Sequence, residues 1–178
     1  MIRVARPLEG WRFAACSRQY RCFAADIPAQ MLTLQGTIVT AGALNCQRAI
    51  AEQIVEQKGD YALALKANHG TLHDDVVLLL EDPECKASRT RPLVEADHGR
   101  IETRTATVST EIGWLQKQHP WPGLKAIGKV ARRRETAEKT TAETAYYLLG
   151  SELTPERFNE VVRQHWSIKN SLHCDWMW

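Results

Sequence analysis

The sequence predicts an α/β domain, and three observations support this fold class. Strand-like and helix-like segments alternate twice between residues 34 and 82, at the spacing of parallel β–α units. Polar and apolar residues alternate after residue 98, as they do in antiparallel strands with one exposed face. A long amphipathic segment, from about residue 154 to 176, predicts a final helix with one broad apolar face.

Length and composition limit the number of domains and the kinds of partner and compartment. With 178 residues, the chain has the size of one domain and can bury a substantial core. Its net charge of +2 and its pI near 8.3 permit a nucleic-acid partner without requiring one. Five cysteines without a CxxC pair favour reduced thiols in a cytoplasmic protein over a disulfide framework or a zinc ribbon. No apolar run approaches the roughly 20 residues that cross a bilayer, so we expect no membrane partner.

Residues 1–25 differ from the rest of the chain. This leader has five arginines and one acid, Glu9, and is net +4, whereas the remaining 153 residues are close to −2. Such a composition also occurs in transit peptides and in DNA-contacting arms, but the leader has a single serine and no clear amphipathic period. We therefore predict a poorly ordered basic leader, 1–25, followed by the domain, 26–178.

The first half of the domain is predicted to contain two strand–helix units. A strand over residues 34–40 precedes a helix over residues 46–58, and a strand over residues 61–66 precedes a helix over residues 70–82, which Pro83 ends. Ligand sites in parallel sheets lie beyond the carboxyl ends of the strands. This rule gives one such site at Ala41, Gly42 and Ala43 and another at Lys66, Asn68 and His69.

The second half is predicted to be mainly antiparallel. Residues 98–110 have the pattern of an exposed strand. Residues 111–124 predict a short helix that is broken by two prolines. Residues 124–135 and 143–151 predict the two strands of a hairpin, with a charged and polar turn between them.

The final helix is predicted to begin at Thr154, which can cap it, with Pro155 at the first helical position. His165 and Lys169 fall near the middle of its apolar face. An unpaired buried ammonium costs several kcal/mol, so three interpretations of Lys169 stay open. Lys169 has a function, it extends to water past its apolar neighbours, or the helix packs loosely at its end. The residues of the apolar face are Phe158, Val161, Val162, Trp166, Ile168 and Leu172.

Several other motifs have two interpretations. His69 and His73 have a spacing that can hold a metal on one helix face, but without a third ligand we interpret them as helix surface. Residues 132–134 are three arginines that could contact phosphates or could form a solvated strand end. Cys46 has no nearby base that would activate a nucleophile. We interpret three tryptophans as packing residues rather than as base-stacking platforms: Trp114, Trp121 and Trp166.

Four stretches together resemble a known family. They are VTAGALNCQRAIAEQIVEQKGDYALALKANHGTLHDDV, HGRIETR, WPGLKAI and VRQHWSIKNSLH, which cover residues 39–173 in this order. This ordered set is similar to the catalytic domain of ISAs1-type insertion-sequence transposases, which include the H-repeat-associated proteins. The resemblance extends from about residue 26 to residue 173.

The resemblance implies an RNase H-like fold, in which helices flank a mixed sheet, with three carboxylates in the Asp-Asp-Glu arrangement. It also implies DNA cleavage and strand transfer at the ends of the element. Intact family members use Mg²⁺, because displacement at a phosphodiester needs two divalent ions held by converging carboxylates. The expected partner is DNA, and a homo-oligomer is an option.

This chain departs from the family pattern at the three acidic positions. The leader has no aspartate, so the sheet is expected to be incomplete at its N-terminal side. Gly42 stands where the second aspartate is expected, and Lys169 stands where the glutamate is expected. No catalytic acid or metal site is then intact, and we expect neither a cofactor nor catalysis in this chain.

Two alternatives to an inactive transposase stay open. One is a remnant without a role, whose missing strand leaves an unpaired sheet edge and causes aggregation or dimerisation. The other is a non-catalytic nucleic-acid-binding remnant, in which Lys129 and Lys169 could also contribute. The candidate DNA-contacting residues are Lys66, Asn68, Arg100, Arg104, Arg132, Arg133, Arg134, Arg163, His165 and Asn170.

Overall fold

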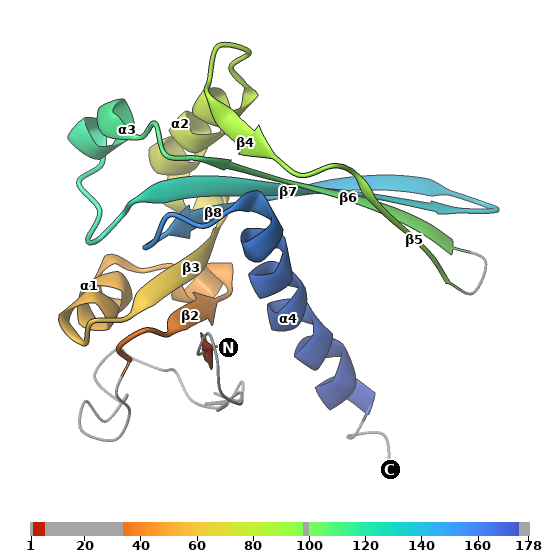
Figure 1. The fold of residues 1–178 in the computed structure, drawn as a ribbon, viewed down its shortest axis with the longest axis horizontal. Coiled ribbons are helices and arrows are strands. Elements are labelled where there is room, and N and C mark those ends of the chain that lie inside the picture. Colours follow the sequence, from red (N-terminus) through yellow and green to blue (C-terminus); the bar gives the residue numbers. More distant parts are fainter. Residues whose placement is uncertain (1, 6–33, 98–99, 175–178) are drawn as a thin grey trace.

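The computed structural model describes residues 2–5, 34–97 and 100–174, and it describes side chains for residues 34–96 and 100–166 (Figure 1). These residues form one eight-stranded mixed sheet. The strand order is β1-β2-β3-β8-β7-β6-β4, and β5 pairs with β6 beside this path. Among the described residues, none of the helices has both the length and the apolar character that a membrane crossing requires.

The two predicted strand–helix units are confirmed. The parallel strands are β2 (Ile38–Ala41) and β3 (Asp60–Leu65), and Ile38 pairs with Asp60 while Ala41 pairs with Leu63. The helices that follow them are α1 (Arg48–Glu56) and α2 (Gly70–Glu81). The α/β fold class is therefore correct.

The antiparallel second half is also confirmed. Strands β7 and β8 form the predicted hairpin. Their pairing is continuous, from Ala126 opposite Leu149 to Glu135 opposite Thr140. The sequence did not predict two short strands, β4 and β5. The elements of this half are β4 (Ala87–Arg89), β5 (Leu93–Asp97), β6 (Arg100–Ser109), α3 (Gly113–Gln118), β7 (Ala126–Thr136), β8 (Thr140–Leu149) and α4 (Pro155–Cys174).

A strand from the predicted leader lies at the edge of β2. This strand, β1 (Ile2–Ala5), is antiparallel to β2 over four residue pairs. One alternative from the sequence was a missing strand that leaves an unpaired sheet edge. On this side of β2 the edge is not open, because β1 pairs with it. Residues 6–33 lie outside the described residues, so the domain boundary at residue 26 stays a prediction.

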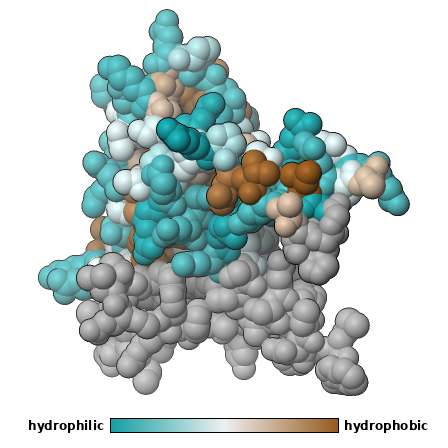
Figure 2. Space-filling view, turned by 45° about the vertical axis from the view of Figure 1, so that its right-hand side comes forward, coloured by the Kyte–Doolittle hydropathy of each residue, from teal (hydrophilic) through white to brown (hydrophobic). Residues whose placement is uncertain are grey.

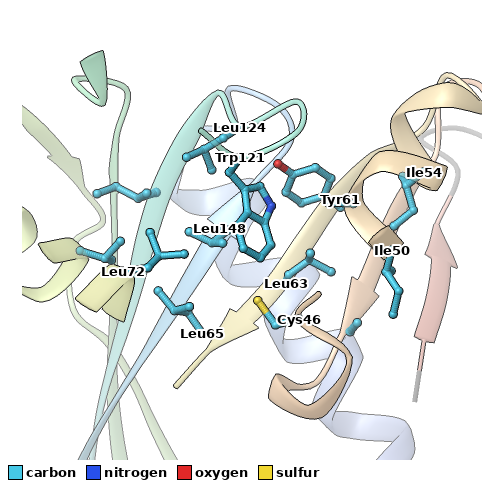
Figure 3. Packing of buried hydrophobic residues seen from close by; sticks show 14 of the residues in the cluster. Cys46, Ile50, Ile54, Tyr61, Leu63, Leu65, Leu72, Trp121, Leu124 and Leu148 are labelled. Atoms are coloured by element: carbon cyan, nitrogen blue, oxygen red, sulfur yellow. The ribbon is translucent and has the colours of Figure 1, made fainter. Parts of the chain in front are cut away.

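The two faces of the sheet have different cores because large and small residues alternate along the strands. Tyr61, Leu63 and Leu65 of β3 point to the face that α1 and α2 cover (Figure 3). Ala62 and Ala64 point to the opposite face, which packs against α4. Small residues on that face allow the helix to approach closely. Three buried residues of α4 complete this second cluster: Phe158, Val161 and Val162.

The start of α4 is capped as predicted. The backbone N–H of Arg157 donates to the Thr154 hydroxyl at 3.3 Å, and Pro155 is the first helical residue. Gly128 of β7 lies directly under the helix, because a Cβ atom added there would be 2.7 Å from Cε1 of Phe158. The glycine therefore sets how closely α4 packs on the sheet.

Candidate active site at the ends of β2 and β3

The carboxyl ends of β2 and β3 lie side by side because the two strands are parallel. A single turn, Ala43–Asn45, follows β2, and a similar turn, Ala67–His69, follows β3. The Asn68 side chain donates a hydrogen bond to the Ala43 carbonyl at 3.2 Å. The His69 ring contacts the Cys46 carbonyl. The structure thus joins the two sites predicted from the sequence into one.

Helix α4 lies on the other face of the sheet and contacts the carboxyl end of β2. Nδ1 of His165 lies 3.0 Å from the hydroxyl oxygen of Thr40, and both residues are buried. Thr40 precedes Gly42 by two residues, and Lys169 follows His165 by about one helical turn. The contact brings the end of β2 and α4 together.

Gly42 has open space around it. Its backbone is extended, with φ −73° and ψ 166°, and a Cβ atom added there would meet no atom within 4 Å. The position could therefore hold an aspartate without strain, but glycine itself supplies no ligand. The described residues contain no group of three or more histidine, cysteine, aspartate or glutamate side chains that could hold a metal ion. The described donors do not fit a two-metal centre.

The side chains of Lys169 and Asn170 lie outside those the structure describes, although both residues belong to α4. Their predicted roles therefore rest on the sequence. His165 is described, and its ring packs edge-on against Trp166 at 5.7 Å as well as contacting Thr40. Its burial indicates a structural contact rather than an exposed contact with DNA.

The three consecutive arginines of β7 are paired with glutamates. Arg132 lies 2.5 Å from Glu143, and Arg133 lies 2.7 Å from Glu135. Arg134 lies 3.3 Å from Glu102. Since these arginines have internal partners, their run of charge is not a free cationic patch.

Glu102 is a nearly buried carboxylate between two arginines. Burial acts to raise the pKa of Glu102, but hydrogen bonds from Arg104 and Arg134 outweigh it and hold the pKa below its ordinary value. Arg104 is therefore committed to an ion pair. Arg163 of α4 is similarly paired, at 2.6 Å, with Glu95 of β5.

Lys129 also has internal partners. It is buried, and its ammonium donates to Glu81 at 2.6 Å and to the Leu80 carbonyl at 3.1 Å. Of the predicted cationic residues with described side chains, Lys66 and Arg100 are exposed, and neither forms an ion pair with another described side chain. They lie apart in the fold, after β3 and at the start of β6.

The packing interpretation of the tryptophans is correct for Trp121, which is buried and packs edge-on against His69 at 5.5 Å (Figure 3). Trp166 is partly exposed and donates to the Tyr147 hydroxyl at 3.4 Å. Trp114 is about half exposed, so the core interpretation is wrong for it. A contact that the sequence did not predict joins His119 to Asp75 at 2.7 Å and holds the loop before Trp121 against α2.

Curated relatives match these elements over most of the chain. The chain is 32% identical over 155 residues to "Putative protein YbfL" of Escherichia coli (strain K12), a match that covers 80% of this chain. It is 31% identical, also over 155 residues, to "H repeat-associated putative transposase YhhI" of the same organism. The chain is homologous to proteins described as H repeat-associated putative transposases. This confirms the family resemblance seen in the sequence.

The homology covers a part of each relative. The chain spans 40% of the length of YbfL and of YhhI. It is 41% identical over 130 residues to "Uncharacterized protein in dhlA 3'region" of Xanthobacter autotrophicus and spans 43% of that protein. No family model matches the chain, and no solved structure matches it.

Proposed function

We propose that this chain derives from the catalytic domain of a DDE-type insertion-sequence transposase with an RNase H-like fold. In this proposal, the chain itself does not cleave DNA. The parallel β2–β3 pair and the contact of α4 with β2 are consistent with such a domain. The observation that carries the proposal is Gly42, which occupies an open and unstrained position. The family resemblance implies an aspartate at this position.

The chemistry explains why this substitution matters. Two-metal phosphodiester chemistry needs carboxylates from separate elements to hold the ions a few ångströms apart. Gly42 offers no oxygen ligand from β2. A lysine at position 169 replaces an anion by a cation, and like charges disfavour a divalent ion nearby. The chain therefore needs no cofactor in this proposal.

Isothermal titration calorimetry with Mn²⁺ and Mg²⁺ tests the proposal. We expect no binding by the unmodified chain and measurable Mn²⁺ binding by the double variant Gly42→Asp/Lys169→Glu. Gly42→Ala is the matched control, because it fills the same space without adding a ligand. Mg²⁺-dependent nicking of DNA by the unmodified chain, or tight binding of either ion by it, would overturn the proposal.

A second candidate function is non-catalytic DNA binding by a protein of the cytoplasm. Lys66 and Arg100 favour it, since both are exposed and have no ion pair among the described residues. Because most of the predicted arginines are paired internally, few phosphates would be neutralised. The logarithm of the affinity then falls with the logarithm of salt concentration with a slope of about −0.9 per phosphate contact.

Fluorescence anisotropy with duplex DNA tests this second function. We expect a shallow salt slope that decreases by about one for each of Lys66→Ala and Arg100→Ala. Lys117→Ala is the control, because Lys117 is exposed on α3 away from both positions. Absence of binding at low salt would exclude this function, and an unchanged slope in both variants would exclude these contacts.

A further inference from the structure

The β7–β8 hairpin extends beyond the part of the sheet that the helices cover, toward the right in Figure 1. Strand β8 pairs with β7 from Thr140 to Leu149. On its other side it pairs with β3 only from Tyr146 to Leu149. Within the described part of the chain, residues 140–145 of β8 therefore have no neighbouring strand on that side.

This open edge has few of the features that protect edge strands. Its sequence, TTAETA, contains no lysine and no proline, and residues 140–144 are exposed. Its one charge, Glu143, is compensated by Arg132 at 2.5 Å. Unpaired backbone groups on such an edge can pair with another strand, and threonine favours extended structure.

The part of the sheet that extends beyond the helices has a second edge, formed by β5, and this edge is protected. Strand β5 follows Pro92 and carries the acidic residues Glu95 and Asp97. Charges and a proline discourage pairing with another strand. The difference between the two edges indicates that the β8 edge, rather than the β5 edge, is the one that can accept a strand.

We propose that residues 140–144 pair antiparallel with the same residues of a second copy, so that two sheets become continuous across a two-fold axis. Directly opposed residues share a face of the sheet, so the axis passes through a residue and not between two residues. An axis at Thr141 would pair only residues 140–142 of β8, because the strand begins at Thr140. An axis at Glu143 would place two like charges directly opposite each other, which is unfavourable. An axis at Thr144 would require Tyr146, which already pairs with β3.

The remaining register has its axis at Ala142. It places Ala142 opposite Ala142 of the second copy and Thr141 opposite Glu143 of the second copy. A hydroxyl group then lies across from each carboxylate, and no charge is opposed by a like charge. The edge is thus self-complementary in this register. Since a few residue pairs bury little surface, the dimer is weak and depends on concentration.

Sedimentation velocity of the full chain over a range of concentrations, under reducing conditions, tests the proposal. We expect a monomer–dimer equilibrium that Ala142→Lys abolishes, because it places two ammonium groups opposite each other at the axis. Ala96→Lys is the control, since Ala96 is exposed on the β5 edge, and it should leave the dimer intact. An unchanged melting temperature for Ala142→Lys would show that its fold is intact.

A second surface on the same extended part of the sheet could form a dimer instead. Figure 2 shows an apolar patch there. Val94 and Ile101 have exposed side chains and lie on the same face of β5 and β6. A dimer that Ile101→Lys dissociates and Ala142→Lys does not would overturn the proposal in favour of this patch. A monomer at every concentration would also overturn it.

Disulfide trapping tests the register independently of stability. Directly opposed Cα atoms in antiparallel strands are about 4.5 to 5.5 Å apart, within the range that a disulfide can bridge. We expect Ala142→Cys to form a dimer linked through residue 142 on mild oxidation. Thr144→Cys should not cross-link to itself, because Thr144 faces Thr140 of the second copy. Cross-linking through residue 144 instead would refute the proposed register. This proposal does not depend on the ancestry of the chain.

Discussion

The Thr40 hydroxyl and Nδ1 of His165 lie 3.0 Å apart, although 125 residues separate them in the sequence. Both groups are buried. The contact fixes α4 against the end of β2, two residues before Gly42. Under the proposed transposase ancestry, this contact keeps the arrangement that would bring an acid at the end of β2 toward an acid of the helix.

Thr40→Val tests how much this contact stabilises the fold. The substitution keeps the shape of the side chain and removes its hydroxyl, so Nδ1 of His165 loses this buried partner. We expect the free energy of unfolding to fall by about 1–3 kcal/mol in urea denaturation. Thr110→Val, at an exposed position outside the strands and helices, should change it little. Equal effects in the two variants would argue against a special role for the contact.

A second prediction concerns the close approach of α4 to the sheet. In Gly128→Ala, the new methyl group would lie 2.7 Å from the buried ring of Phe158, which must move. We expect destabilisation of about 1–3 kcal/mol. Gly42→Ala adds the same methyl group in open space at an ordinary φ of −73°, and should be neutral or stabilising. Thermal melts of the two variants measure the difference, which should disappear if the helix packs loosely.

The α/β fold could be predicted because its signals are local. Tyr61, Leu63 and Leu65 alternate with alanines in β3, and this pattern shows both the strand and its two buried faces. The two helices have clear apolar periods. Strands β4 and β5 could not be predicted, because Ala87–Arg89 is three residues long and Pro92 obscures the start of β5. Their strand conformation comes from pairing with β6.

The candidate site could be predicted only in part. Parallel pairing was enough to place Gly42 and Lys66 at adjacent strand ends. Three of the internal ion pairs were not predictable from one sequence, because they join residues of different strands or helices: Arg132–Glu143, Arg134–Glu102 and Arg163–Glu95. Glu102 pairs with Arg134 through the register of β6 and β7, which the sequence alone does not fix. The sequence alone therefore did not show that these arginines have glutamate partners, and their predicted contacts with DNA stay a prediction.

The Glu81–Lys129 pair gives a prediction for pH dependence. A hydrogen bond from Lys129 lowers the pKa of Glu81 below its ordinary value. A lowered pKa in the folded state stabilises the fold above the pKa of the unfolded state, and this stabilisation is lost as the pH falls through the folded-state pKa. We expect Glu81→Gln to destabilise the protein at neutral pH by less than about 1 kcal/mol, because Glu81 is largely exposed.

The difference between Glu81→Gln and the unmodified chain should disappear in acid, where Glu81 is protonated in both states. Urea denaturation at a series of pH values from neutral to acid measures it. Glu84→Gln is the control, because Glu84 is exposed and forms no ion pair among the described residues. A difference that persists unchanged in acid would mean that the charge of Glu81 does not contribute.

The final prediction concerns Cys46 in the core beside β3. Burial raises the pKa of its thiol to about 12, so the reactive thiolate is scarce at neutral pH and the sulfur is inaccessible. We expect iodoacetamide to label Cys46 much more slowly than Cys85, which is partly exposed. Peptide mapping by mass spectrometry distinguishes the two thiols, and urea should equalise their rates. Fast labelling of Cys46 in the native protein would mean that the α1 side of the core opens readily, because its thiolate cannot form while it is buried.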